Sequence, residues 1–362
     1  MATTQTSIGA LQIVQRMGPG GIETMALDLM RDPILGGDII SLAGTTGELV
    51  QGWPALAPLA GRIRGLGQGT ISHGRLIAML VRLLRRARPR AVIAHHIGPL
   101  LHGGIAARIA GVPNVIHVEH DAWHYADAKH RMIARVCERL VRPRHVAVSE
   151  EVAASSRKVL PGADFSIVAP GIDMERYHPA DRTAARSGLG LSVAGCIVGS
   201  VGRLAEVKGH RHLVKALTRL PPDVHAVIVG DGPERAMLEG LALELGVAGR
   251  LHLLGLRSDA ERIIPAFDVF CLPSMAEGLP RALIEAQACG VPAVASDVGG
   301  VSRALAPGGR LVVAGDADAL AGAIREVLAA PPPAAVVRAH VAERFSLEAT
   351  VLALRSLVGE GP

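Results

Sequence analysis

Two basic side chains stand five residues apart in Val201-Gly202-Arg203-Leu204-Ala205-Glu206-Val207-Lys208-Gly209. Arg203 follows an apolar, strand-like run, and Lys208 opens the next helical segment. Ligands of parallel α/β sheets bind at the carboxyl ends of the strands, so both cations can converge on one diphosphate. The other interpretation is a pair of solvated surface charges, and it is weakened by the position of the pair at the ligand end of a sheet.

Two carboxylates follow further along the chain, in EGLPRALIE at 277–285. Pro280 suits a first helical turn, which places Glu277 in the preceding loop and Glu285 inside an apolar helix. A carboxylate in such a helix needs hydrogen-bond donors, and sugar hydroxyls are suitable ones. Alternatively, Glu285 faces water or caps a neighbouring backbone group.

A glycine-rich segment, Gly18-Pro19-Gly20-Gly21-Ile22-Glu23, lies between a strand and a helix in the first half of the chain. Glycines at such a turn let backbone amides approach an anion at the helix N-terminus. The spacing is not GxGxxG, so contact with a phosphate or sugar and a plain tight turn both stay open.

Histidines gather in the same half, with His117, His120 and His124 at spacings compatible with a zinc site and His95-His96 upstream. However, His117 and His120 end a strand, in which alternate side chains point to opposite faces. We therefore expect no metal.

The elements that position these residues alternate between strands and helices, which predicts right-handed βαβ units and parallel sheets. Strands are expected at 10–15, 38–42, 91–95, 114–118 and 145–148, and again at 196–201, 226–229, 251–254, 269–272, 293–295 and 311–313. Helices are expected near 22–31, 74–88, 100–110, 128–141, 209–220, 234–245, 282–288, 317–329 and 347–357, with a Pro/Ala-rich break at 330–335.

Composition agrees with a two-domain α/β protein. The 362 residues are 49% hydrophobic and only 2% aromatic, which suits buried parallel strands with Ala/Leu-rich helices. The four cysteines show no paired spacing, which argues against a disulfide framework. The first residues lack a signal-peptide pattern and no apolar run is long enough to span a bilayer, so the cytoplasm is the expected compartment.

In their order and spacing these segments resemble glycosyltransferase family 4, a group of retaining enzymes of GT-B architecture. The matching pieces are GGIE at 20–23, VEHD at 118–121, PGID and RYHP within 170–179, VGRLAEVKG at 201–209, GDGP at 230–233 and EGLPRALIEAQACGVPAVASDVGG at 277–300. One departure is Pro170, where the family commonly has Asn.

The resemblance implies a role for each matching residue. Arg203 and Lys208 would bind the donor diphosphate and stabilise it as it leaves, Glu285 would hold the ribose, and Glu277 would contact the transferred sugar. Gly278 and Leu279 would support sugar or phosphate through their backbone amides, and Gly20 and Gly21 would face the diphosphate. His120 would lie near the donor sugar, and Arg257 would frame the nucleobase.

The resemblance also implies two facing Rossmann-like domains. The expected boundaries are 1–174 on the acceptor side, 175–341 for the nucleotide-sugar and 342–362 for a helix packing back on the first domain. The implied reaction is sugar transfer from a nucleotide-diphosphate-sugar to a glycan or lipid-linked glycan, with retained anomeric configuration, no cofactor and no metal. The nucleotide, the sugar and the oligomeric state stay open.

The stretch from Leu49 to Val118 contains no acidic residue but nine arginines, namely Arg62, Arg64, Arg75, Arg82, Arg85, Arg86, Arg88, Arg90 and Arg108. On a helical wheel of 74–88, four arginines face one side and the leucines the other. We favour the interpretation that this basic surface attracts anionic lipids at the inner face of the cytoplasmic membrane over the interpretation that it is an ordinary solvated helix face. Nucleic-acid binding comes third, because stacking aromatics are nearly absent.

Two other classes of protein stay as alternatives. A dinucleotide-dependent oxidoreductase would need GxGxxG and a later acidic residue, and it would leave the 277–285 segment unexplained. A non-catalytic sugar-binding protein of two domains would normally carry an export signal. Titration with nucleotide-sugars separates all three.

Overall fold

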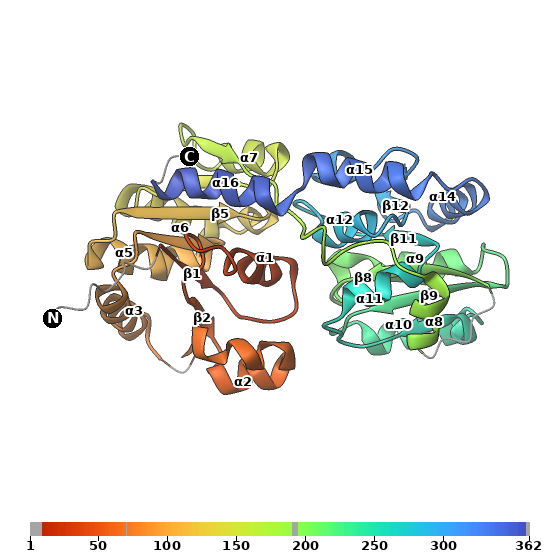
Figure 1. The fold of residues 1–362 in the computed structure, drawn as a ribbon, viewed down its shortest axis with the longest axis horizontal. Helices are drawn as coiled ribbons and strands as arrows, with labels where there is room; N and C mark the ends of the chain where they lie inside the picture. Colours follow the sequence, from red (N-terminus) through yellow and green to blue (C-terminus); the bar gives the residue numbers. More distant parts are fainter. Residues whose placement is uncertain (1–8, 70, 190–194, 360–362) are drawn as a thin grey trace. The chain divides into compact units, whose positions relative to one another are not determined.

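The computed structural model describes residues 9–69, 71–189 and 195–359. The chain divides into two compact units, one made of residues 1–171 and 348–362 and the other of residues 172–347. The boundaries expected from sequence were 174/175 and 341/342. Figure 1 draws the first unit in red to yellow-green with the dark-blue final helix, and the second in green to blue.

The first unit is a seven-stranded sheet with strand order β3-β2-β1-β4-β5-β6-β7, in which all the pairings are parallel. Its strands are β1 (Ala10–Val14), β2 (Ile39–Ala43), β3 (Ile63–Gln68), β4 (Ala91–His95), β5 (Asn114–Glu119), β6 (Arg144–Ala147) and β7 (Phe165–Ile167). Its helices are α1 (Gly21–Leu29), α2 (Thr46–Gly52), α3 (His73–Ala87), α4 (Ile97–Pro99), α5 (Ile105–Ala110), α6 (Ala128–Leu140), α7 (Glu150–Arg157) and α16 (Leu347–Val358). Short helical turns are η1 (Pro54–Arg62), η2 (Leu100–Gly104) and η3 (Trp123–Ala126).

The second unit is a six-stranded sheet with strand order β10-β9-β8-β11-β12-β13, again parallel. Its strands are β8 (Cys196–Val201), β9 (Val224–Val229), β10 (Leu251–Leu253), β11 (Val269–Leu272), β12 (Ala293–Ser296) and β13 (Arg310–Val312). Its helices are α8 (Arg182–Gly188), α9 (His210–Leu217), α10 (Arg235–Glu244), α11 (Ala260–Ile263), α12 (Arg281–Ala288), α13 (Val301–Ala304), α14 (Ala317–Ala329) and α15 (Ala334–Arg344). Short helical turns are η4 (Glu206–Lys208), η5 (Ala248–Arg250) and η6 (Ile264–Ala266).

Most expected elements are confirmed, but several were not predicted. These are the strands β3 and β7 and the helices α2, α4, α7, α8, α11, α13 and α15, the last of which begins inside the expected break. The strand β3 reads IRGLGQ, whose glycines and arginine hide the apolar alternation of an edge strand. The break itself is short, because three prolines at 331–333 end α14 and Pro333 caps α15 directly.

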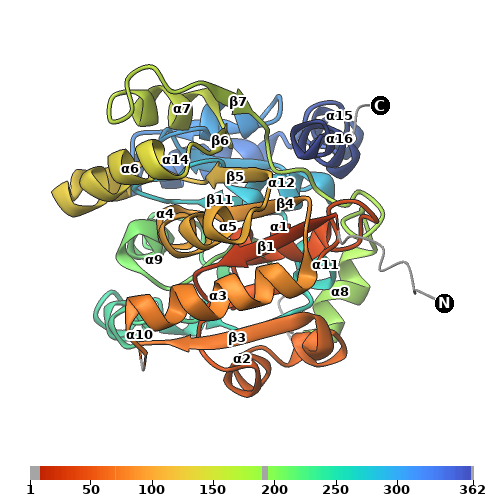
Figure 2. The same ribbon diagram turned by 90° about the vertical axis from the view of Figure 1, so that its left-hand side faces the viewer.

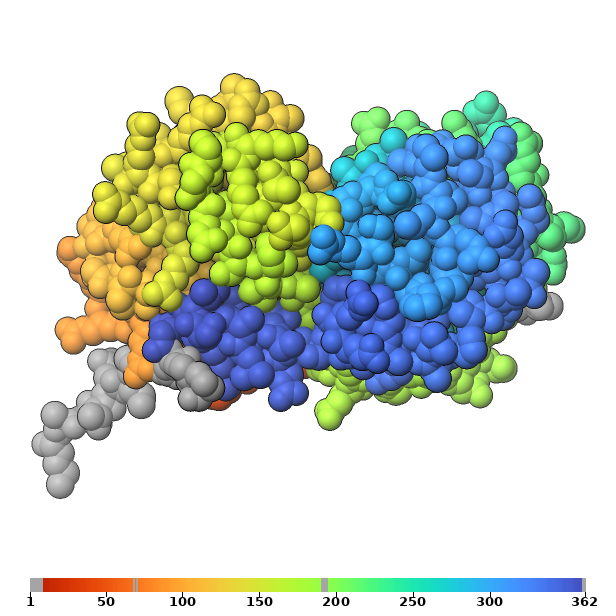
Figure 3. Space-filling model, turned by 90° about the horizontal axis from the view of Figure 1, so that it is seen from above, coloured from red at the N-terminus to blue at the C-terminus, as the bar shows by residue number. Residues whose placement is uncertain are grey.

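The C-terminal helix α16 belongs to the first unit. Arg355 on α16 pairs with Asp32, which follows α1, and the Asn114 side chain donates a hydrogen bond to the Val358 carbonyl at 3.0 Å. The chain therefore crosses from the first unit to the second and back again. In Figure 3 the dark-blue helix lies against the yellow-green segments of the first unit.

Within the described residues no single helix is both long and apolar enough to cross a membrane. One bent pair, α14 with α15, meets the length and composition criteria together, with an angle of 112° between its two helices.

The core of the second unit contains a glycine that only close packing explains. A Cβ at Gly199 in β8 would overlap the ring of Phe267, which is fully buried. We expect Gly199→Ala to lower the free energy of unfolding of this unit by about 1–3 kcal/mol through overpacking. Gly240→Ala is the matched control, because Gly240 lies exposed in α10 with open space around it, and it should raise stability by about 0.5–1 kcal/mol. Urea unfolding measures the change in stability of both variants. Equal changes for Gly199→Ala and Gly240→Ala would contradict this account of the packing.

Candidate active site

The carboxyl ends of β8 and β11 bring together the basic and acidic segments of the second unit. These strands are neighbours in the sheet, with Val269 opposite Val198 and Phe270 opposite Gly199. The chain leaving β8 carries Lys208 in η4, and the chain leaving β11 carries Glu277. Segments 69 residues apart in sequence therefore meet at one edge of the sheet, where ligands of such folds bind.

Lys208 and Glu277 form a short ion pair. The Lys208 Nζ donates to Glu277 Oε1 at 2.7 Å, and the Ser274 hydroxyl donates to the same oxygen at 2.6 Å. The side chain of Glu277 is 6% exposed and that of Lys208 is 30% exposed. The carboxylate is therefore held in place while the ammonium group keeps access to a ligand.

Two glycines with positive φ make this approach possible. Gly209 follows Lys208 with φ +62°, and a Cβ there would collide with the carbonyl of Pro273. Gly299 has φ +52°, and a Cβ there would collide with the carbonyl of Glu277. Left-handed backbone and close contact both require glycine at these positions. The Gly300 amide then donates to the Gly278 carbonyl at 2.8 Å, which fixes the loop carrying Glu277, Gly278 and Leu279.

Arg203 is exposed just beyond the end of β8, and its guanidinium makes no hydrogen bond or ion pair with the described residues. Arg257, in the loop after β10, is engaged instead: its Nε and Nη2 donate to the two oxygens of Asp259 at 2.8 and 2.6 Å. Arg203 is thus available to an incoming anion, whereas Arg257 would first have to leave Asp259 to contact a nucleobase through its guanidinium.

Glu285 is buried inside α12, with 7% of the residue exposed. Its Oε1 lies 3.5 Å from the guanidinium of Arg281, one turn earlier in the same helix. The alternative that Glu285 simply faces water is therefore excluded. A carboxylate can accept several hydrogen bonds at once, so an ion pair with Arg281 is compatible with accepting a bond from a ligand hydroxyl.

In the first unit, Gly20 caps the N-terminus of α1 and Gly21 is its first residue. The φ of Gly20 is −168°, an extended conformation open to any residue, so the backbone conformation does not require glycine there. A Cβ at position 20 would collide with the carboxylate of Glu23. The Glu23 side chain thus lies over the helix N-terminus, where the family resemblance implies a diphosphate.

His120 is held by a chain of hydrogen bonds that begins on β1. The Gln12 amide nitrogen donates to the Ala26 carbonyl at 2.9 Å, so its Oε1 accepts from His95 Nε2 at 3.0 Å. Burial lowers the pKa of His95 to about 4, which keeps this ring neutral with a lone pair on Nδ1. The Nε2 of His120, 3.1 Å from that lone pair, must therefore carry the proton.

His117 points away from His120, as strand alternation predicts. Its Nδ1 lies 3.2 Å from His145 Nδ1, and His145 Nε2 lies 2.7 Å from a carboxylate oxygen of Glu138 on α6. The histidines considered from the sequence as a metal set do not form one ligand group. His120 lies against His95, whereas His117 Nε2 and His124 Nε2 each lie 3.8 Å from the same oxygen of Glu119. The structure groups His96, Asp121 and His124 instead.

Sequence reasoning missed Ser274, Gln12 and His95 as parts of these two clusters. Each carried a signal, because Gln12 and His95 are polar residues within otherwise apolar buried strands and Ser274 follows one. A polar side chain in a buried strand needs a hydrogen-bond partner, so its presence there indicates a polar cluster inside the protein.

The fold and the donor-side cluster define a protein of the GT-B glycosyltransferase class. Two family models match the chain, "Glycosyltransferase Family 4" over residues 19–176 and "Glycosyl transferases group 1" over residues 181–343. The chain belongs to glycosyltransferase family 4, as its motifs indicated.

Curated relatives include D-inositol 3-phosphate glycosyltransferases. The one from Mycolicibacterium gilvum is 41% identical over 177 residues, which cover 46% of this chain and 40% of the relative. The one from Mycolicibacterium vanbaalenii is 38% identical over 220 residues, which cover 55% of this chain and 48% of the relative. The chain thus spans less than half the length of these curated relatives.

Solved structures share the whole fold at low identity. The crystal structure of Anabaena HepE in complex with UDP and glucose has a TM-score of 0.83 at 24% identity, covering 96% of this chain and 98% of that one. WaaG, a glycosyltransferase involved in lipopolysaccharide biosynthesis, has a TM-score of 0.74 at 19% identity, covering 97% and 100%. These likenesses confirm the two Rossmann-like parallel-sheet domains.

The Gln12–His95–His120 chain predicts the protonation pattern of His120. In ¹⁵N NMR of the histidine ring nitrogens, His120 should carry its proton on Nε2, and Gln12→Leu should allow the other tautomer. The variant should also lose about 1–3 kcal/mol of stability, because His95 Nε2 loses its buried acceptor. Gln51→Leu, at an exposed position, should change neither property. A wild-type His120 protonated on Nδ1 would refute the chain as described.

Proposed function

We propose that the protein is a glycosyltransferase that moves a sugar, of the hexosyl type, from a nucleotide-diphosphate-sugar to an acceptor with retained anomeric configuration. The observation that carries this proposal is the arrangement of Arg203, Lys208 and Glu277 at the carboxyl ends of β8 and β11, with buried Glu285 on α12. Family membership supports the same reaction class. The UDP and UDP-glucose complexes of HepE support a nucleotide-sugar donor.

Charge explains how these residues would act. Cleavage of the sugar–phosphate bond leaves negative charge on the diphosphate, and fixed cations stabilise it as it develops. Arg203 and Lys208 would supply these cations, so the proposed donor chemistry needs no metal ion. Glu277 and Glu285 would accept hydrogen bonds from hydroxyls of the sugar and the ribose. Retention would follow from attack on the face that the leaving group departs from, with the leaving phosphate taking the acceptor proton.

The acceptor that we propose is a glycan or a lipid-linked glycan, met on the cytoplasmic side of the membrane. Support comes from the basic side of the first unit, where Arg75, Arg82, Arg85 and Arg86 are exposed on α3 while Leu76, Leu80 and Leu84 are buried, as the helical wheel predicted. An anionic lipid surface gains about 1 kcal/mol for each such cation. Figure 2 shows α3 lying in front of the sheet with α5 beside it.

Apolar side chains extend this basic surface along α6. Met132, Val136 and Leu140 are 61%, 40% and 65% exposed and lie one turn apart on the same helix face. The Arg85 guanidinium on α3 donates to the Ile109 carbonyl at 3.3 Å, and Arg108 on α5 donates to the Val141 carbonyl at 2.7 Å. These contacts tie α3, α5 and the end of α6 together. Exposed apolar residues beside cations are typical of surfaces that rest on lipid headgroups.

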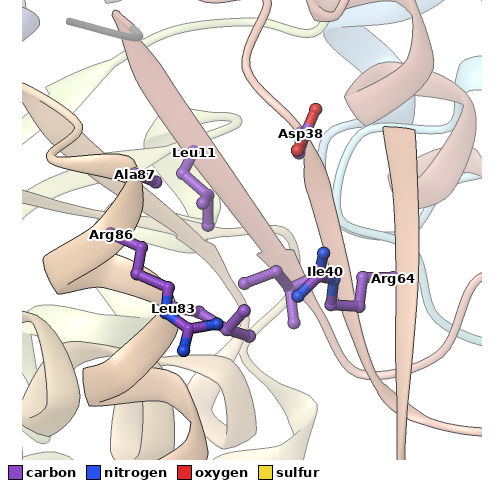
Figure 4. A pocket seen from close by; sticks show the side chains of 7 residues that line it. All are labelled: Leu11, Asp38, Ile40, Arg64, Leu83, Arg86 and Ala87. Carbon is purple, nitrogen blue, oxygen red and sulfur yellow. The ribbon is translucent and has the colours of Figure 1, made fainter. Parts of the chain in front are cut away.

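A small cavity lies beside the basic face of α3. It has a volume of about 250 Å³ and is lined by Leu11, Asp38, Ile40, Arg64, Leu83, Arg86 and Ala87. Figure 4 shows Arg64 and Arg86 flanking an apolar floor of leucine and isoleucine. It lies at the amino-terminal edge of the strands, away from His120. Two guanidinium groups over apolar side chains suit an anionic amphiphile, which supports the membrane part of the proposal.

The donor site is tested with a panel of nucleotide-sugars, nicotinamide dinucleotides and free sugars in thermal-shift and titration assays. One nucleotide-sugar should stabilise the protein, and Lys208→Ala and Glu285→Ala should each weaken its binding roughly 10–150-fold, as expected for charge-assisted hydrogen bonds of about 1.5–3 kcal/mol. Arg219→Ala, which breaks an exposed ion pair with Asp318, is the control and should bind normally.

Two outcomes would contradict the proposal. Selective binding of a dinucleotide would indicate an oxidoreductase, and binding of free sugar without donor hydrolysis would indicate a non-catalytic protein. NMR of the product anomer tests the stereochemistry, and an inverted product would refute retention.

Membrane attachment is tested by flotation with vesicles of phosphatidylcholine, with and without phosphatidylglycerol. The wild type should float only with the anionic vesicles, and the triple variant Arg75→Ala, Arg82→Ala, Arg86→Ala should bind roughly 100-fold more weakly, for about 1 kcal/mol per cation. A matched triple variant at Arg219, Arg310 and Arg325, exposed arginines of the second unit, should bind like the wild type. Equal binding to both vesicles would refute the electrostatic account.

A further inference from the structure

Three side chains of the first unit converge where β4 and β5 end. Asp121 Oδ2 lies 3.2 Å from His96 Nε2, and Asp121 Oδ1 lies 3.1 Å from His124 Nδ1. One donor atom from each residue lies within 4.8 Å of the other two. We propose that His96, Asp121 and His124 form a binding site for a divalent transition-metal ion of the zinc type, in addition to the donor site of the proposed function.

The donor set and its spacing fit such an ion. Two imidazoles and one carboxylate are ligands that zinc takes, at metal–ligand distances of about 2.0–2.2 Å, which place tetrahedral ligands about 3.3 Å apart. The two histidine–aspartate separations are already near that value, each to a different oxygen of Asp121. The carboxylate would therefore bind through both oxygens or turn slightly, and the two imidazoles, whose ring centroids lie 4.4 Å apart, would approach each other. Each ring would coordinate in its neutral form. A ring that is already neutral would carry its proton on the nitrogen that faces away from the ion, and a protonated ring would release one proton to solvent.

A buried carboxylate completes the arrangement. Metal-bound histidines commonly direct their second ring nitrogen to a carboxylate. With Nδ1 of His124 on the ion, its Nε2 faces Glu119 Oε2 at 3.8 Å. Among the described residues neither the Nε2 of His124 nor the Oε1 of Glu119 has a hydrogen-bond partner, although both atoms are buried and the His124 side chain is only 7% exposed. A bound cation would strengthen this ring N–H as a donor towards the carboxylate. Glu119 is itself anchored by the Tyr125 hydroxyl at 2.7 Å.

The backbone of His96 adopts a strained conformation that turns its side chain toward the proposed site. Its φ of +80° and ψ of 171° belong to a region occupied almost only by glycine, and other residues adopt it at an energetic cost. Its amide is held by the Val118 carbonyl at 3.0 Å, which ties the end of β4 to β5. The conformation turns the imidazole of His96 toward Asp121 instead of continuing the strand. A ligand shared by both loops would offset this strain.

The test uses the full chain with any polyhistidine tag removed. The protein is incubated with Zn²⁺ or with Mg²⁺, desalted, and analysed by mass spectrometry for bound metal. We expect about one zinc per chain and no retained magnesium, since the site has nitrogen ligands. His96→Ala and Asp121→Ala should each retain less than about a tenth of the zinc, because one ligand of three is lost.

The control is His225→Ala, which breaks a different pair of histidines, with His252 at 3.0 Å in the second unit, and it should keep the full zinc content. Circular dichroism confirms that each variant is folded, and His124→Asn provides a second, milder change if an alanine variant is not. A zinc-dependent rise in melting temperature should disappear together with the bound metal. No retained zinc in the wild type, or zinc retained equally by all variants, would overturn the proposal, and the Asp121 hydrogen bonds would then serve a metal-free cluster. Donor binding is measured separately, so either proposal can fail alone.

Discussion

The short contact between Lys208 and Glu277 is the constraint around which the second unit is arranged. It joins the segments that follow β8 and β11. These two segments can approach each other closely only where no Cβ atom stands between their backbones. Gly209 and Gly299 meet that requirement through positive φ and through contact with the carbonyls of Pro273 and Glu277. The ion pair also holds the Lys208 ammonium group at the edge of the sheet, near the exposed guanidinium of Arg203. Sheet order, glycine placement and the charge of the proposed donor site are therefore consequences of one geometry.

The positions of the residues proposed for the donor site could be predicted from sequence because they lie close together along the chain. Arg203 and Lys208 lie within one βα turn, and Glu277 and Glu285 lie within the next loop and helix, so strand and helix periodicity was enough to place them. The regular strands of both sheets were found for the same reason. Two of the failures have a local cause: β3 contains glycines at an edge, and η2 replaces the first turn of the helix expected at 100–110.

The histidine cluster of the first unit shows where such reasoning ends. Alternation along β5 predicted that the side chains of His117 and His120 point to opposite faces. It could not show which residue would lie beside His124. That residue is His96, whose side chain reaches Asp121 only because its backbone adopts a conformation rare outside glycine. Likewise, the link from Gln12 through His95 to His120 joins three strands or loops that are distant in sequence. Pairings set by strand register and by local strain are not encoded in any short motif.

The return of α16 to the first unit bears on how the protein is made. During synthesis the N-terminal residues leave the ribosome first, and the whole second unit must follow before Arg355 can reach Asp32. Until then Asp32, largely buried in the finished protein, lacks its guanidinium partner, and Asn114 lacks the Val358 carbonyl. The first unit therefore cannot finish folding before the second has been translated. The helix α16 completes this unit only at the end of synthesis. A ribosome that stalls after residue 172 but before α16 would therefore expose an incompletely folded first unit to chaperones and proteases.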